Sequence, residues 1–144
     1  FCLEHRNDIC FHMIGQPQRI KKQFYSYCNI VVYPRIPDDM YFSVIDDCDY
    51  SFLPLTFATA NNALLEAGFL GTTSILPRIP GVEDYGAPSP LNLYYSNMEE
   101  AKDLFVVLKK RNKSLDLICF CEENFLWDSV YYKLNDYYKT LMDK

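Results

Sequence analysis

The chain has 144 residues, with 14 Lys and Arg against 19 Asp and Glu, which gives a formal net charge of −5. This length allows one domain with a real hydrophobic core and leaves little room for a second. Hydrophobic residues make up 49% of the chain and charged residues 23%, a balance that excludes an intrinsically disordered protein. The acidic charge argues against a nucleic-acid partner, since nucleic-acid-binding domains usually carry a basic surface.

The sequence predicts neither a membrane span nor a signal peptide. No apolar stretch approaches the ~20 residues that a membrane-spanning helix needs. The chain opens at Phe1, and no basic segment leads into an apolar one. The opening Phe-Cys-Leu-Glu-His-Arg is typical of the end of a helix, and we therefore expect the chain to be a fragment of a longer protein.

The six cysteines form no paired CxxC framework, so we predict reduced, buried thiols rather than disulfides, as in a cytoplasmic protein. A zinc site at Cys119 and Cys121 would need two more ligands, and the only histidines are His5 and His12. We therefore predict no metal site. Two basic groups are interpreted as solvated helix faces: Arg19, Lys21 and Lys22, and then Lys109, Lys110, Arg111 and Lys113.

Short apolar runs alternate with amphipathic segments, which is the pattern of a parallel sheet wrapped by helices. Strands are predicted over residues 9–14, 29–33, 50–55, 72–76 and 91–95. Helices are predicted over residues 17–28, 38–48, 62–70, 98–110, 115–122 and 127–142, with a long loop rich in Pro and Gly over residues 77–90. We therefore predict an α/β domain of the Rossmann-like type, with three α/β/α layers around a parallel sheet of about five strands.

Ligands of open parallel sheets bind beyond the carboxyl ends of the strands, so the strand-to-helix segment over residues 53–71 is the first place to look for chemistry. Ala58, Thr59 and Ala60 are small enough for a phosphate to approach the backbone, and Asn61 or Asn62 can cap the helix. The free N–H groups of a helix start suit a pyrophosphate.

About one turn inside this helix lies Glu66, a carboxylate able to accept two hydrogen bonds from a ribose diol, as acidic residues do in dinucleotide-binding folds. Gly71 is well placed to end the helix as its C′ residue.

Residues 64–71, Leu-Leu-Glu-Ala-Gly-Phe-Leu-Gly, resemble the second half of the E-x7-E motif in the C-terminal domain of family 4 glycosyltransferases (glycosyl transferases group 1). Residues 29–37 and 45–50 are similar to the family's base-binding strand and loop and to the entry of its motif strand. Residues 79–86 are similar to its I-P-G-x-x-E-x-x loop, and residues 124–127 to the F-S-W that opens its last helix. The resemblance covers almost the whole chain in the same order.

The resemblance implies that residues 1–144 are the C-terminal, donor-binding half of a GT-B fold, without the N-terminal domain that holds the acceptor. The implied substrate is a nucleotide sugar of the UDP or GDP type, with no cofactor and no metal, transferred with retention to a glycan or lipid acceptor. The implied place is the cytoplasm, at the inner face of the membrane, with peripheral membrane contact made through the absent domain. The fragment alone is expected to be inactive.

The resemblance also implies roles for particular residues. The pyrophosphate would be held by the helix start, the ribose by Glu66, and the sugar side would be met by Thr59. The family's first motif Glu is replaced by Ala58, so no catalytic residue is identified. The pyrophosphate set is Ala60, Asn61, Asn62 and Ala63, and the nucleobase loop comprises Pro34, Arg35 and Ile36, with Met40 behind it.

Two other hypotheses remain open. Ala58 is compatible with a non-catalytic, glycosyltransferase-like binding domain. Asp46, Asp47 and Asp49 resemble the acidic cluster of a receiver or flavodoxin-like module, but they precede a strand, whereas a receiver's acceptor Asp ends one.

His12 is interpreted as a core histidine and Trp127 as a core anchor, and packing and rim positions are assigned to Tyr131, Tyr132, Tyr137 and Tyr138.

Overall fold

The computed structural model describes residues 8–15, 22–33, 35–58 and 61–142. Its five strands form two parallel sheets. In the first, β1 (Phe11–Ile14) pairs with β2 (Ile30–Tyr33), and Phe11 lies opposite Ile30. The second has the order β3-β4-β5, built from β3 (Tyr50–Phe52), β4 (Thr73–Pro77) and β5 (Leu93–Tyr95). All five predicted strands are therefore confirmed, each shorter or shifted by a few residues at most.

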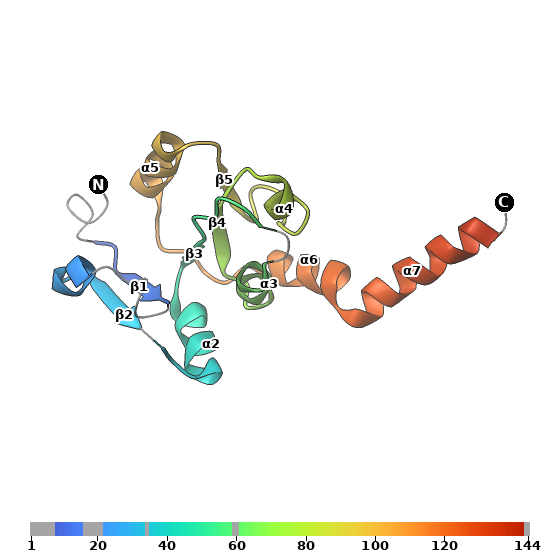
Figure 1. Ribbon diagram of the computed structural model, residues 1–144, viewed down its shortest axis with the longest axis horizontal. Helices are drawn as coiled ribbons and strands as arrows, with labels where there is room; N and C mark the ends of the chain where they lie inside the picture. Colours follow the sequence, from blue (N-terminus) through green and yellow to red (C-terminus); the bar gives the residue numbers. More distant parts are fainter. Residues whose placement is uncertain (1–7, 16–21, 34, 59–60, 143–144) are drawn as a thin grey trace.

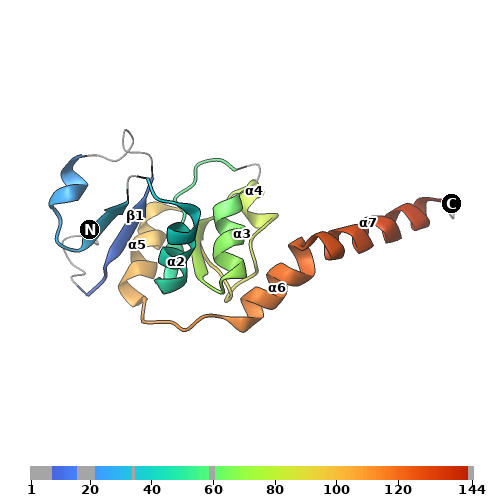
Figure 2. The ribbon, with the colours of Figure 1, turned by 90° about the horizontal axis from the view of Figure 1, so that it is seen from below.

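Helices cover both faces of these strands. One face is covered by α5 (Met98–Val107), and the other by α2 (Asp38–Asp47), α3 (Asn62–Phe69) and α6 (Leu115–Phe125) (Figures 1 and 2). The remaining helical elements are the 3-10 turn η2 (Lys22–Ser26), the short α4 (Pro80–Glu83) and α7 (Trp127–Met142). The arrangement is an α/β fold of the Rossmann-like type, as the alternation of apolar runs and amphipathic segments predicts.

Neighbouring residues of β4 fill two separate cores. Ile75 packs with Phe105 and Ala101 on the α5 side, whereas Leu76 packs with Leu64 and Val82 on the α3 side. Every residue of β4 is buried, which explains why its sequence is a continuous apolar run with two small hydroxyl residues rather than an alternating pattern.

The limits of α3 follow from its terminal residues. At its start Asn61 is the N-cap, and its side-chain Oδ1 accepts a hydrogen bond of 3.2 Å from the Leu64 amide. At its end Gly71 adopts a φ of +69°, a conformation that favours glycine. The Gly71 amide donates to the Gly68 carbonyl (2.9 Å) and the Thr72 amide to the Ala67 carbonyl (2.8 Å), which is the Schellman arrangement. The predicted cap and C′ residue are both confirmed.

Several local predictions are wrong. The helix predicted over residues 17–28 is only a 3-10 turn where the structure describes it, in η2. The long loop over residues 77–90 contains α4, which starts with Pro80 at its first position, where proline costs no hydrogen bond.

The second basic group does not lie on a solvated helix face, because residues 108–114 form no helix. Lys113 instead holds the end of α2 to the start of β4. Its Nζ donates to the carbonyls of Ile45 (3.2 Å) and Cys48 (3.1 Å) and to Oγ1 of Thr72 (2.6 Å).

The α7 helix runs away from the rest of the molecule (Figures 1 and 2). Trp127, predicted to be a core anchor, has 84% of its surface exposed. The four tyrosines assigned to packing and rim positions are exposed as well, at Tyr131, Tyr132, Tyr137 and Tyr138. An amphipathic pattern shows that a helix has an apolar face, but not whether another part of the same chain covers it.

The predictions for the thiols and for His12 are also corrected. All five described cysteines are free; Cys121 is buried and Cys48 half-buried, whereas Cys10, Cys28 and Cys119 are exposed. His12 is exposed rather than in the core, and its Nδ1 lies 3.0 Å from the Tyr33 hydroxyl, with the two rings stacked.

Candidate functional site

Glu66 lies on the side of α3 that faces α2. The Tyr41 hydroxyl on α2 donates a hydrogen bond of 2.8 Å to Oε2 of Glu66, and the Glu66 side chain is half-buried. Burial, and secondarily this hydrogen bond and the charge of Glu66, raise the pKa of Tyr41 well above its usual range. The phenol therefore stays protonated at neutral pH and acts as a donor. Oε1 of Glu66 accepts no hydrogen bond from the described residues and can receive a ligand hydroxyl.

The start of α3 offers two backbone donors. Asn61 caps the helix through the amide of Leu64, and its carbonyl accepts from Leu64 and Leu65 in the first turn. The amides of Asn62 and Ala63 donate to no group in the described part of the chain. A helix start with two available N–H groups and the positive end of the helix dipole can bind an anionic group. Of the other two predicted phosphate and sugar residues, Ala60 and Thr59 lie outside the described residues.

The predicted nucleobase residues lie at the start of α2. Arg35 is exposed, Ile36 is half-buried and Met40 has 44% of its surface exposed; Pro34 lies outside the described residues. Tyr41 directly follows Met40, so its hydrogen bond to Glu66 brings the first turn of α2 beside the second turn of α3. The structure thus brings together two predicted parts of the site that are far apart in the sequence.

Gly81 of α4 lies against the β3–α3 loop at Ala58. A Cβ at position 81 would overlap the carbonyl oxygen of Ala58, so α4 packs directly on the backbone of this loop. Ala58 itself is half-buried in the cluster around Leu76 and Val82. A methyl group packed in this way provides no acid, base or nucleophile.

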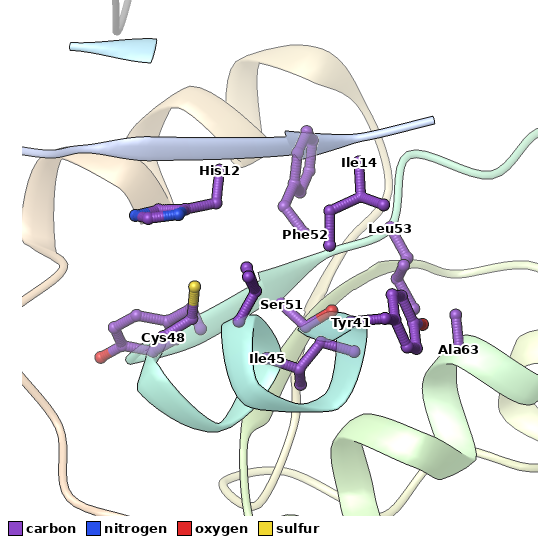
Figure 3. Close-up of a pocket in the computed structure, with 11 residues that line it drawn as sticks. His12, Ile14, Tyr41, Ile45, Cys48, Ser51, Phe52, Leu53 and Ala63 are labelled. Atoms are coloured by element: carbon purple, nitrogen blue, oxygen red, sulfur yellow. The ribbon is translucent and has the colours of Figure 1, made fainter. Parts of the chain in front are cut away.

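A cavity of about 220 Å³ lies next to this site, between β1, α2 and β3 (Figure 3). Ala63 and Tyr41 are among its lining residues, but neither Glu66 nor the nucleobase residues are. Pockets for drug-sized ligands are usually about 300–1,000 Å³, so this cavity is too small for a nucleotide sugar. This cavity is therefore not the donor site predicted above.

Two residues of the site escape prediction from sequence. Tyr41 is one of several apolar and aromatic residues along α2, and no local signal pairs it with a carboxylate 25 residues away. Gly81 stands in the I-P-G of the resemblance, and its close approach to Ala58 depends on how α4 packs. Residues 77–90 are predicted to be a loop, so the sequence gives no signal that Gly81 approaches the backbone of Ala58.

No protein-family model matches this sequence, and no curated protein matches it. Among the described residues, no group of three or more His, Cys, Asp and Glu side chains is placed to hold a metal ion, and no helix is long and apolar enough to cross a membrane.

Proposed function

We propose that this chain is the nucleotide-sugar-binding domain of a glycosyltransferase. The observation that carries the proposal is the placement of Glu66, whose carboxylate is held by Tyr41 about one turn from the start of α3. A carboxylate for a sugar-ring diol and backbone donors for a diphosphate then lie about one helical turn, or ~6 Å, apart along α3.

In this proposal each part of the donor meets one element. The diphosphate binds the amides of Asn62 and Ala63, and the ribose hydroxyls donate to Glu66. The base lies over the loop at Arg35 and Ile36, with the exposed Met40 beside it. The substrate is a UDP or GDP sugar, and the group is transferred to a glycan or lipid acceptor with retention.

Catalysis then comes from positioning the donor and from stabilising the departing diphosphate, because Ala58 provides no reactive group. The acceptor is held by a second domain that lies N-terminal to this one, with peripheral membrane contact through that domain at the cytoplasmic face. By itself the chain binds nucleoside diphosphate weakly and transfers no sugar.

The test is calorimetric titration of the chain with UDP and GDP. We expect Glu66→Gln to weaken binding of the preferred nucleotide by about tenfold, because it removes a charged acceptor. Glu123→Gln, an exposed carboxylate on α6, is the matched control and leaves affinity unchanged. The 2′,3′-dideoxy nucleotide lacks the diol, so Glu66→Gln is expected to leave the affinity for this nucleotide unchanged. Absence of binding by both nucleotides, or equal loss in the two variants, rejects the proposal.

A second candidate is a binding domain that has lost catalysis, and Ala58 is the observation that favours it. Ala58→Glu in the protein at its natural length separates the two candidates by sugar transfer. A large gain in transfer indicates a decayed enzyme, whereas an unchanged high rate shows that position 58 is dispensable. A receiver-like phosphoacceptor is disfavoured, because no Asp lies within two residues after any of the five described strands.

A further inference from the structure

The edge of β1 that faces away from β2 carries backbone groups that β2 does not use. In a parallel pair, alternate residues of a strand direct their N–H and C=O to the same edge. The amides of Phe11 and Gly15 donate to the carbonyls of Asn29 (2.8 Å) and Tyr33 (3.2 Å). By this alternation Phe11, Met13 and Gly15 face β2. His12 and Ile14 therefore direct their backbone groups away from β2.

The same alternation holds in β3. The Leu53 amide donates to the Ile75 carbonyl of β4 at 3.2 Å, so Ser51 and Leu53 face β4. Tyr50 and Phe52 direct their backbone groups to the opposite edge. Neither edge joins a further strand in the described part of the chain.

These two edges face each other. His12, Ile14, Tyr50 and Phe52 are the four residues that the alternation assigns to the outer edges, and all four line the cavity of about 220 Å³. Figure 3 labels three of them, His12, Ile14 and Phe52. Ile14, the last residue of β1, and Leu53, directly after β3, lie toward the same end of the cavity, whereas His12 and Cys48 lie toward the other.

Helices cover both faces of this gap, as they cover the faces of a continuous sheet. On one side Tyr41, Val44 and Ile45 of α2 line the cavity. On the other side the rings of Phe11 and Phe52 lie 6.1 Å and 5.1 Å from the ring of Phe105 on α5. Strands β1 and β3 therefore lie in one layer between the same two helices, and that layer is interrupted in its middle (Figure 1).

We propose that a sixth strand, parallel to β1 and β3, occupies this gap and joins the two sheets into one. Its backbone pairs with His12 and Ile14 on one edge and with Tyr50 and Phe52 on the other. A central parallel strand covered by helices on both faces is apolar throughout, so the occupant is a short, continuously apolar segment.

The strand belongs to the same polypeptide. None of residues 1–7, 16–21, 34, 59–60 and 143–144 forms a continuously apolar sequence long enough for it, so the strand comes from a part of that polypeptide beyond these 144 residues. Peptides from other proteins add to sheets at exposed edges. This gap is covered by α2 and α5, so a segment can enter it only by folding together with them. The carboxyl end of the added strand emerges beside Ala63, at the start of α3. The proposal depends on strand pairing alone and does not rest on the proposed donor binding.

The test is NMR of the isotope-labelled protein at its natural length. We expect the amides of His12, Ile14, Tyr50 and Phe52 to exchange with solvent at rates within about tenfold of those of Met13 and Ser51, as hydrogen-bonded central strands do. We also expect nuclear Overhauser contacts from His12 and from Phe52 to one common segment that is neither β1 nor β3. Direct contacts between β1 and β3, or exchange of the four amides about 100-fold faster than that of Met13, overturn the proposal.

Paired proline variants test the same point by thermal unfolding. His12→Pro removes an amide directed into the gap, whereas Val32→Pro removes one directed to the outer edge of β2, where proline is tolerated better. With a strand in the gap, His12→Pro lowers Tm by at least about twice as much as Val32→Pro, because it breaks a central ladder. Equal shifts in Tm show that both edges are open and count against the sixth strand.

Discussion

The thiol of Cys121 on α6 lies directly against Gly68 on α3, so that a Cβ added at position 68 would come within 2.5 Å of Sγ. Both residues are buried, at the place where α3 and α6 pack together. Glycine at position 68 is therefore required by the close approach of the two helices.

Gly68→Ala is expected to destabilise the chain by about 1–3 kcal/mol, despite the better helix propensity of alanine, because it overfills this contact. In a Cys121→Ala background the same substitution is expected to cost little, since the sulfur that it meets is gone. Urea unfolding of the parent chain, the two single variants and the double variant measures the coupling between the two sites. Equal cost of Gly68→Ala in both backgrounds would show that Sγ is not the obstacle.

Tyr41→Phe is expected to change how stability depends on alkaline pH. The folded chain holds the pKa of Tyr41 above its ordinary value of about 10, through burial and then through Glu66. The stabilisation from the neutral phenol is therefore complete below about pH 10 and is lost as pH rises from there toward the folded value. The variant lacks this part of the alkaline decline. Unfolding free energies from pH 7 to about pH 11 measure it, with the exposed Tyr25→Phe as control. Parallel declines in Tyr41→Phe and the parent chain would contradict the assignment.

The sequence allows the elements of this fold to be predicted better than their meeting points. The five strands are visible because their apolar runs are bounded by Gly, Pro and polar residues, and α3 because Asn61 and Gly71 mark its ends. The hydrogen bond from Tyr41 to Glu66 and the contact of Gly81 with Ala58 depend on how helices cross, which no local pattern records. The exposure of Trp127 is missed for a related reason, because the apolar face of α7 is visible in the sequence, whereas the sequence does not show whether another element covers that face.

Lys113 is expected to be a structural residue, in contrast to Lys110. Lys113→Met removes three hydrogen bonds from Nζ and leaves the Thr72 hydroxyl, which is buried, without that partner. The loss is expected to be about 1–3 kcal/mol of unfolding free energy. Lys110→Met, at an exposed position three residues earlier, is expected to stay within about 0.5 kcal/mol of the parent chain. Thermal or urea unfolding compares them, and similar losses in both variants would refute the difference.

Cys119 and Cys121 on the same helix are expected to differ sharply in reactivity. Cys119 is exposed, whereas burial, with a smaller contribution from Glu122, raises the pKa of the Cys121 thiol to about 11. Because the thiolate is the reactive form, Cys121 is both inaccessible and almost entirely protonated at pH 7.5. Brief treatment with iodoacetamide is expected to alkylate Cys119 and spare Cys121, and alkylation in urea to modify both. Tandem mass spectrometry locates the adduct, since one tryptic peptide contains the two residues. Equal labelling of the two in the absence of urea would show that α6 does not bury Cys121 against α3 in solution.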